Sequence, residues 1–108
     1  MANNQRDVFA TEYSAILREE FPDYCIRYTD DQLRFLLLQE CDRQKAYSVG
    51  SAYGIYTMLT LRLRLGGPFP EGEDHAWARE ILARDLVPEA DRIAALEEVV
   101  WGVEENQP

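Results

Sequence analysis

Proline and glycine residues divide this chain into segments of helix length. The main interruptions are Pro22, Gly50, the pair Gly66-Gly67 and Pro88. Helices usually end before a proline, and a glycine commonly follows the last helical turn. Between these points apolar residues recur every three or four positions, which is the spacing of one helix face. The sequence therefore predicts an all-α, compact single domain of about five helices over residues 1–108.

One segment also fits a strand. Residues Leu59–Leu65 alternate between apolar and polar side chains, as a half-buried strand does. No second strand-like run is present to pair with it, and an unpaired strand is not stable in water. We therefore expect a helix here that ends at Gly66-Gly67.

The five expected helices follow from apolar spacing together with capping and breaking residues. They run from Asp7 to Glu20 or Phe21, from a Thr29-Asp30-Asp31 cap to about Ala46, from Tyr53 to Leu65, from an Asp74 cap to Asp85, and from Pro88 or Glu89 to about Glu104. We expect residues 1–6 and 104–108 to be frayed, because they are polar and have little to bury.

The expected core combines the apolar faces of these helices with one loop residue. Phe69 lies in the proline- and glycine-rich loop 66–73, and we expect it to anchor that loop on the core. The residues predicted to be buried are Leu33, Leu36, Leu37, Leu59, Leu63, Phe69, Trp77, Ile81 and Leu96.

Charge and composition exclude several classes of function. The chain has 11 Lys and Arg against 20 Asp and Glu, a formal net charge of -9. Such a chain is repelled by nucleic acid and by anionic membranes. The polar start Met1–Gln5 is unlike a signal peptide, and the longest apolar run, Phe35–Leu38, is too short to span a bilayer. We expect a cytoplasmic protein without a membrane or nucleic-acid partner.

Two constellations invite a chemical interpretation. The group Glu71, Glu73, Asp74 and His75 resembles a metal site in composition, but it matches neither a calcium loop nor the spacing of zinc ligands. Asp74 is better explained as a helix cap.

Cys25 or Cys41 could also meet His75 in space as a catalytic pair. Neither cysteine has the turn or helix-start context that activates a thiol. We predict two reduced structural thiols, no catalytic residues, no metal and no cofactor.

Binding is the remaining class of function. Tyrosine, tryptophan and arginine dominate binding hot spots, and Pro68 and Pro70 stiffen the loop that follows the third expected helix. The acidic bias of residues 71–108, with eleven acidic and three basic side chains, suits a basic partner. The predicted partner-binding residues are Tyr53, Tyr56, Arg62, Phe69 and Glu71.

The middle of the chain resembles a known family, over roughly residues 13–96. The residues that carry the resemblance are, in order, Phe21-Pro22, Thr29-Asp30-Asp31-Gln32-Leu33-Arg34, Ala46-Tyr47-Ser48-Val49, Leu65-Gly66, Phe69, Trp77-Ala78 and Ile81-Leu82. This pattern is similar to that of small helical proteins encoded in bacterial type VI secretion effector gene clusters. The chain departs from the pattern at Ser48, where the family has a turn glycine, at Ala52-Tyr53-Gly54, at Gly72-Glu73 and at Ala76.

The resemblance implies an accessory role without catalysis. Members of that family are encoded beside effector toxins, effector chaperones, and PAAR and spike proteins. The first hypothesis is an adaptor or co-chaperone that binds one of these proteins and is a monomer outside the complex. The second is an immunity protein that binds and neutralises a cognate toxin, and the third is a small enzyme that uses a cysteine and His75.

Overall fold

A computed structural model describes residues 3–66 and 68–105, and all regular structure within them is helical. The all-α prediction is therefore confirmed. The elements are α1 (Asn3–Glu20), α2 (Pro22–Cys25), α3 (Asp30–Gln44), the 3₁₀ helix η1 (Lys45–Tyr47), α4 (Ala52–Leu65), the 3₁₀ helix η2 (Glu73–His75), α5 (Ala76–Leu82) and α6 (Glu89–Glu105).

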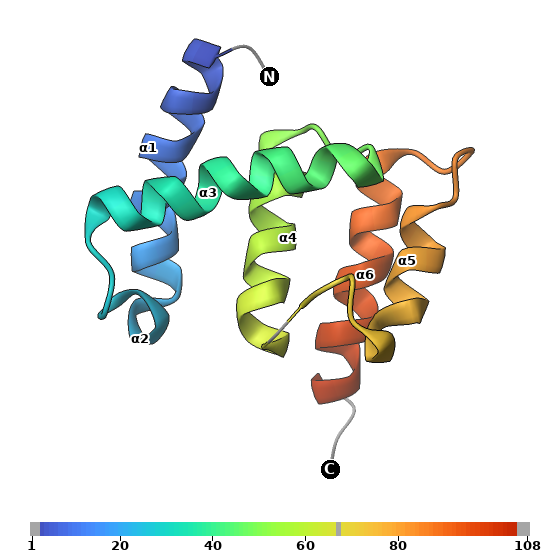
Figure 1. Cartoon of the computed structure of the whole chain (residues 1–108). Helices are drawn as coiled ribbons and strands as arrows, with labels where there is room; N and C mark the ends of the chain where they lie inside the picture. Colours follow the sequence, from blue (N-terminus) through green and yellow to red (C-terminus); the bar gives the residue numbers. More distant parts are fainter. Residues whose placement is uncertain (1–2, 67, 106–108) are drawn as a thin grey trace.

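Helix α3 joins the two halves of the molecule. It crosses α1 near its own start and packs on α4 further along, while α4, α6 and α5 lie side by side on the other half (Figure 1). The contacts run from α1 to α3, from α3 to α4, from α4 to α6 and from α6 to α5. In the view of Figure 1, α4 lies between α1 and α6, which matters for the site described below.

The core is built from the apolar faces that the sequence predicts. Six of the nine predicted core residues are buried: Leu33, Leu37, Leu59, Phe69, Ile81 and Leu96. The other three are only partly buried and pack against the core from its edge: Leu36, Leu63 and Trp77. Both cysteines are free and buried, as predicted for structural thiols.

The helix starts agree with the sequence in one case and differ in another. Thr29 caps α3 as expected: its hydroxyl accepts from the Gln32 amide at 3.1 Å, and the Gln32 side chain accepts from the Thr29 amide at 2.8 Å. The Asp74 cap is wrong, because Asp74 lies inside η2, whose N-cap is Gly72. A tight 3₁₀ turn thus precedes α5. His75 is the N-cap residue of α5, and its side chain forms no capping hydrogen bond.

The chain ends and the first link also differ from expectation. Helix α1 begins at Asn3 rather than Asp7, so the segment that we expected to be frayed is helical from Asn3 onward. Residues 1–2 and 106–108 of the expected frayed ends lie outside the described residues. The link after α1 contains the short helix α2, because Pro22 at its first turn needs no amide hydrogen bond there.

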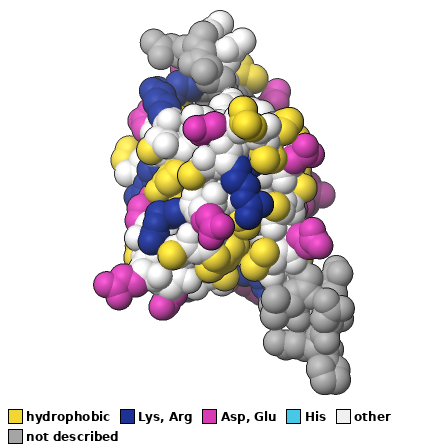
Figure 2. Space-filling view, turned by 90° about the vertical axis from the view of Figure 1, so that its right-hand side faces the viewer, with side chains coloured by type: hydrophobic (Ala, Val, Ile, Leu, Met, Phe, Trp, Pro, Cys, Tyr) yellow, Lys and Arg dark blue, Asp and Glu magenta, His cyan; other side chains and the backbone are white. Residues whose placement is uncertain are grey.

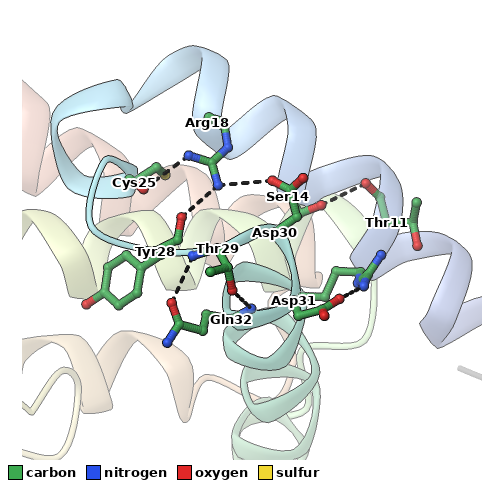
Figure 3. A network of polar contacts seen from close by, with 10 residues as sticks. Thr11, Ser14, Arg18, Cys25, Tyr28, Thr29, Asp30, Asp31 and Gln32 are labelled. Atoms are coloured by element: carbon green, nitrogen blue, oxygen red, sulfur yellow. Dashed lines mark hydrogen bonds and ion pairs between the residues drawn. The ribbon is translucent and has the colours of Figure 1, made fainter.

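Arg18 ties α1 to the link and to the start of α3. Its guanidinium donates to the carbonyl of Cys25 at 3.1 Å, to the carbonyl of Tyr28 at 2.9 Å and to Oδ1 of Asp30 at 3.0 Å (Figure 3). Two of these acceptors are backbone carbonyls of the link between α1 and α3, and the Cys25 carbonyl also accepts from the Tyr28 amide at 2.9 Å. One side chain therefore fixes how α1, α2 and α3 meet.

The loop between α4 and α5 is fastened from both sides. Phe69 is fully buried, and its ring lies 5.2 Å from the His75 ring and 6.1 Å from the Trp77 ring, centroid to centroid. Arg79 donates to the carbonyls of Pro70 and Gly72, both at 2.7 Å. The expected anchoring of this loop by Phe69 is thus confirmed.

Candidate protein-binding site

The five residues predicted to bind a partner do not share one surface. Tyr53 and Arg62 are nine residues apart on α4, and at 3.6 residues per turn they point in roughly opposite directions. Tyr53 is 59% exposed, whereas Tyr56 and Phe69 are buried. In this conformation Phe69 supports the loop from beneath and offers a partner no direct contact.

Arg62 faces α3, where it pairs with a buried carboxylate. Its Nε donates to Oε1 of Glu40 at 3.0 Å and its Nη2 donates to Oε2 at 3.1 Å. The Glu40 side chain is 2% exposed and that of Arg62 is 12% exposed. Gln44 adds a donor to Oε2 of Glu40 at 2.6 Å. A bidentate pair this well buried holds α3 against α4, so the role of Arg62 in this structure is architectural.

Glu71 belongs to the same side of the molecule as Arg62. Its Oε2 lies 3.5 Å from Nη1 of Arg62, and 46% of its side chain is exposed. Burial, together with the charge of Glu71 and a hydrogen bond to it, raises the pKa of Tyr47. Glu71 thus fastens the loop to Arg62 and to Tyr47 of η1, and it remains partly open to solvent.

Tyr53 and Tyr56 lie in a groove between α1, α4 and α6. The floor comes from buried residues of α4, and α1 and α6 form the two walls. The lining residues are Tyr13, Ile16, Glu20, Phe21, Tyr53, Tyr56, Thr57, Thr60, Glu97 and Trp101. Most of this surface is aromatic or aliphatic, with one carboxylate on each wall.

Each wall carboxylate accepts a hydrogen bond from a tyrosine. The Tyr56 hydroxyl donates to Oε1 of Glu20 at 2.6 Å, and the Tyr53 hydroxyl donates to Oε1 of Glu97 at 2.9 Å. Burial, followed by the bond to Glu20, raises the pKa of Tyr56 well above its usual value. The bond to Glu97, followed by burial, raises the pKa of Tyr53. Both tyrosines therefore keep their protons at neutral pH and hold the carboxylates in place.

Aromatic contacts line the groove along its length. The Tyr13 ring lies 5.0 Å from the Tyr56 ring and 4.9 Å from the Phe9 ring, centroid to centroid. At the α6 end, the guanidinium carbon of Arg64 lies 4.3 Å from the centroid of a Trp101 ring, a cation–π contact. Rigid aromatic walls of this kind offer contact area at little cost in side-chain entropy.

A second depression continues the groove toward the start of α1. It is lined by Asn4, Gln5, Val8, Phe9, Glu12, Tyr13, Gly50 and Ala52. Tyr13 lines both depressions, and the α1 residues of both follow one helical stripe. We call the two together the α1 groove. Its charged lining residues are Glu12, Glu20 and Glu97.

Two other parts of the surface are weaker candidates for a binding site. Figure 2 shows the face over α5, where hydrophobic, basic and acidic side chains are interspersed and no kind of side chain gathers. Around the start of α3, Ile26 is 82% exposed and Phe35 is 60% exposed, beside a depression that includes Tyr28. The one charged residue in the lining of this depression, Asp31, forms an ion pair with Arg34.

Both cysteine thiols are buried. Burial raises the pKa of both thiols, and the nearby Arg18 (at Cys25) and Arg6 (at Cys41) offset only part of that rise. Within the described part of the chain, no group of three or more His, Cys, Asp or Glu side chains is placed to hold a metal ion. None of the helices over residues 3–66 and 68–105 is both long and apolar enough to cross a membrane.

Sequence reasoning located part of this groove. Tyr53 and Tyr56 were predicted as binding residues, and Tyr13 lies on the expected apolar face of α1. Glu20 and Glu97 carry no sequence signal that connects them to Tyr56 and Tyr53, because 36 and 44 residues separate the partners. Comparison with known protein families, curated proteins and solved structures gave no match to this chain.

Proposed function

We propose that this chain is a non-enzymatic protein-binding factor that takes up a segment of another protein in the α1 groove. The observation that carries the proposal is the groove itself: its lining comes from α1, α4 and α6 and is mostly aromatic or aliphatic, and a tyrosine holds one carboxylate on each wall. Buried aromatic clusters with a polar rim are typical of interface hot spots. Of the residues that the sequence suggested, Tyr53 remains a proposed binding residue, and we add Ile16 and Trp101, which line the same groove.

The partner class rests on the sequence resemblance. We propose an adaptor or co-chaperone that binds a type VI secretion effector, its chaperone, or a PAAR or spike protein in the cytoplasm. A folded domain whose binding surface is already formed suits a carrier role, because little ordering entropy is lost on docking.

A second candidate is an immunity protein. It is favoured by the net charge of -9 and by the carboxylates of the groove, which suit a toxin with a basic active-site face. Growth of cells that express the cognate toxin separates the two: an immunity protein restores growth, whereas an adaptor supports secretion and leaves toxicity unchanged.

The experiment is co-purification of the chain with the products of its neighbouring genes, using groove variants. Ile16→Asp and Tyr53→Ala change exposed wall residues and are expected to leave the fold intact. At a hot spot each should weaken capture by about 1–3 kcal/mol, or roughly five- to 150-fold. Phe35→Ala is the matched control, because Phe35 is 60% exposed against 59% for Tyr53 but lies outside the groove. Equal capture by all three variants would refute the proposal, as would a requirement for Cys25, Cys41 or His75 in folded protein.

A further inference from the structure

We propose that the occupant of the α1 groove is a basic amphipathic helix of the partner protein. This inference rests on the proposed function and adds the chemistry of the bound segment. It follows from three observations: the charge of the lining residues, the way their carboxylates are held, and the shape of the groove along α1.

The first observation is the sign of the charge. Three lining residues are charged, and all three are acidic: Glu12 and Glu20 on α1, and Glu97 on α6. The rest of the lining is apolar, aromatic or neutral, and the Arg64 guanidinium lies over the Trp101 ring at one end. Because the whole chain carries a net charge of -9, a cationic segment is attracted at long range as well as at the groove.

The second observation concerns two of these carboxylates. A carboxylate has about four positions at which it can accept a hydrogen bond, and one tyrosine hydroxyl occupies one of them on Glu20 and on Glu97. The remaining positions suit a lysine ammonium or an arginine guanidinium. The tyrosines hold both acceptors in place before the partner arrives, so that less side-chain entropy is lost on binding.

The third observation is that helices alone form the groove. A segment that binds by strand addition needs an unpaired sheet edge, and the described residues contain no strand. A helix satisfies its own backbone hydrogen bonds and offers apolar residues at intervals of three and four. The stripe of α1 that lines the groove extends from Asn4 to Glu20, about 24 Å along the helix axis, which matches an occupant of four to five turns.

A second copy of this chain is a poorer occupant. It would bring another net charge of -9 toward a groove whose charged residues are carboxylates. Like charges brought together at an interface oppose association. The segment that fits is therefore basic and belongs to another protein.

The test uses the full chain and three labelled synthetic peptides of about 18 residues. All three have the same leucine and phenylalanine content: one is an amphipathic helix with a Lys/Arg polar face, one carries Glu on that face, and one has the basic composition in scrambled order. Fluorescence anisotropy of each labelled peptide, held dilute and titrated with the protein up to about 1 mM, measures each dissociation constant. We expect the basic amphipathic peptide to bind at least tenfold more tightly than either of the others, and its affinity to fall as salt rises from 50 to 500 mM, about a threefold drop in screening length.

Paired variants locate the binding. Glu20→Gln and Glu97→Gln should each weaken the basic peptide about two- to fivefold, and the double variant Glu20→Lys/Glu97→Lys at least tenfold. Glu19→Gln and Glu98→Gln are the matched controls. They remove the same charge one position away, at exposed residues that do not line the groove, and should change affinity less than twofold.

The outcomes separate this inference from the function on which it rests. Equal effects of the groove and control variants would mean unspecific attraction to an acidic protein, and would overturn the inference. Absence of binding, equal binding of all three peptides, or a dimer that the double variant disperses would also overturn it. Each of these leaves the proposed function standing if Ile16→Asp and Tyr53→Ala still lose the partner protein, and removes it if they do not.

Discussion

Replacing Arg62 with methionine should destabilise the folded chain by about 3–5 kcal/mol, the usual cost of leaving one member of a buried ion pair without its partner. Glu40 is 2% exposed, so water cannot replace the two hydrogen bonds that Arg62 donates to it. Loss of the 3.5 Å contact with the half-exposed Glu71 adds less than about 1 kcal/mol. A domain of this size has a total free energy of unfolding of about 5–15 kcal/mol, so the variant should be close to unfolding.

The double variant Glu40→Leu/Arg62→Met should recover most of that loss. Removing both charges abolishes the desolvation cost, and an apolar pair of similar volume is often neutral or stabilising by about 1–4 kcal/mol. Glu40→Leu alone should cost less than Arg62→Met, because the Arg62 side chain is 12% exposed and still reaches Glu71. In a double-mutant cycle, the effects of Glu40→Leu and Arg62→Met on the free energy of unfolding should therefore be strongly non-additive, with a favourable coupling energy between the two side chains.

Urea denaturation followed by circular dichroism gives the free energy of unfolding of the four proteins. The expected order of stability places the wild type and the double variant above Glu40→Leu, and Arg62→Met last. A loss below about 1 kcal/mol in Arg62→Met, or additive effects in the double variant, would refute the assignment of Arg62 to the fold. Arg62 would then return to the partner-binding residues, as the sequence alone suggested.

Three further outcomes follow from single sites. Phe69→Ala should cost about 3–5 kcal/mol in urea denaturation, and Trp77→Ala clearly less, because Phe69 is fully buried and Trp77 only partly; the reverse order would contradict this packing. Ser48→Gly should raise the melting temperature, since Ser48 has a left-handed φ of 56° that costs a serine about 1 kcal/mol, and a lowered value would count against that conformation. Burial raises the pKa of Glu89, but hydrogen bonds from the Ser51 hydroxyl and from two amides outweigh it and lower the pKa overall. Its stabilisation is therefore present above pH ~4.3 and lost as the pH falls through the lowered pKa. In urea denaturation at a series of pH values, Glu89→Gln should reduce the loss of stability between neutral and acid pH, and an unchanged pH dependence would refute this role.

The sequence predicts the helices of this chain well because local rules determine them. Pro22 and Pro88 act on the backbone beside them, and the Thr29 cap needs only Gln32 three residues away. The Asp74 cap failed for a local reason as well: the chain tightens into a 3₁₀ turn after Gly72, which moves the start of the α-helix to Ala76. The local sequence pattern does not predict whether residues 73–75 form a 3₁₀ turn or the first turn of the α-helix.

The candidate site was harder to predict, because it depends on how the helices dock. Tyr53 and Arg62 were grouped since both are amphipathic residues of one helix, but half a turn of rotation sends one toward α6 and the other toward α3. Tyr56 was assigned to the surface, and the docking of α1 buries it against Tyr13 and Glu20. Spacing along the sequence predicts which face of its helix a residue lies on. Which residues of other helices it contacts depends on the tertiary arrangement.

The structure also explains how the groove can exist without weakening the domain. Helix α1 presents two adjacent stripes: Phe9 and Leu17 are buried in the core, whereas Val8 and Ile16, one position earlier, remain 55% and 36% exposed. Helix α3 packs on α1, and of these four residues the exposed Val8 and Ile16 line the groove together with the buried Phe9, whereas Leu17 does not. Changes at exposed groove residues should therefore alter binding while the fold persists, and changes at Leu17 should do the reverse. This separation is what allows the groove variants to test function independently of stability.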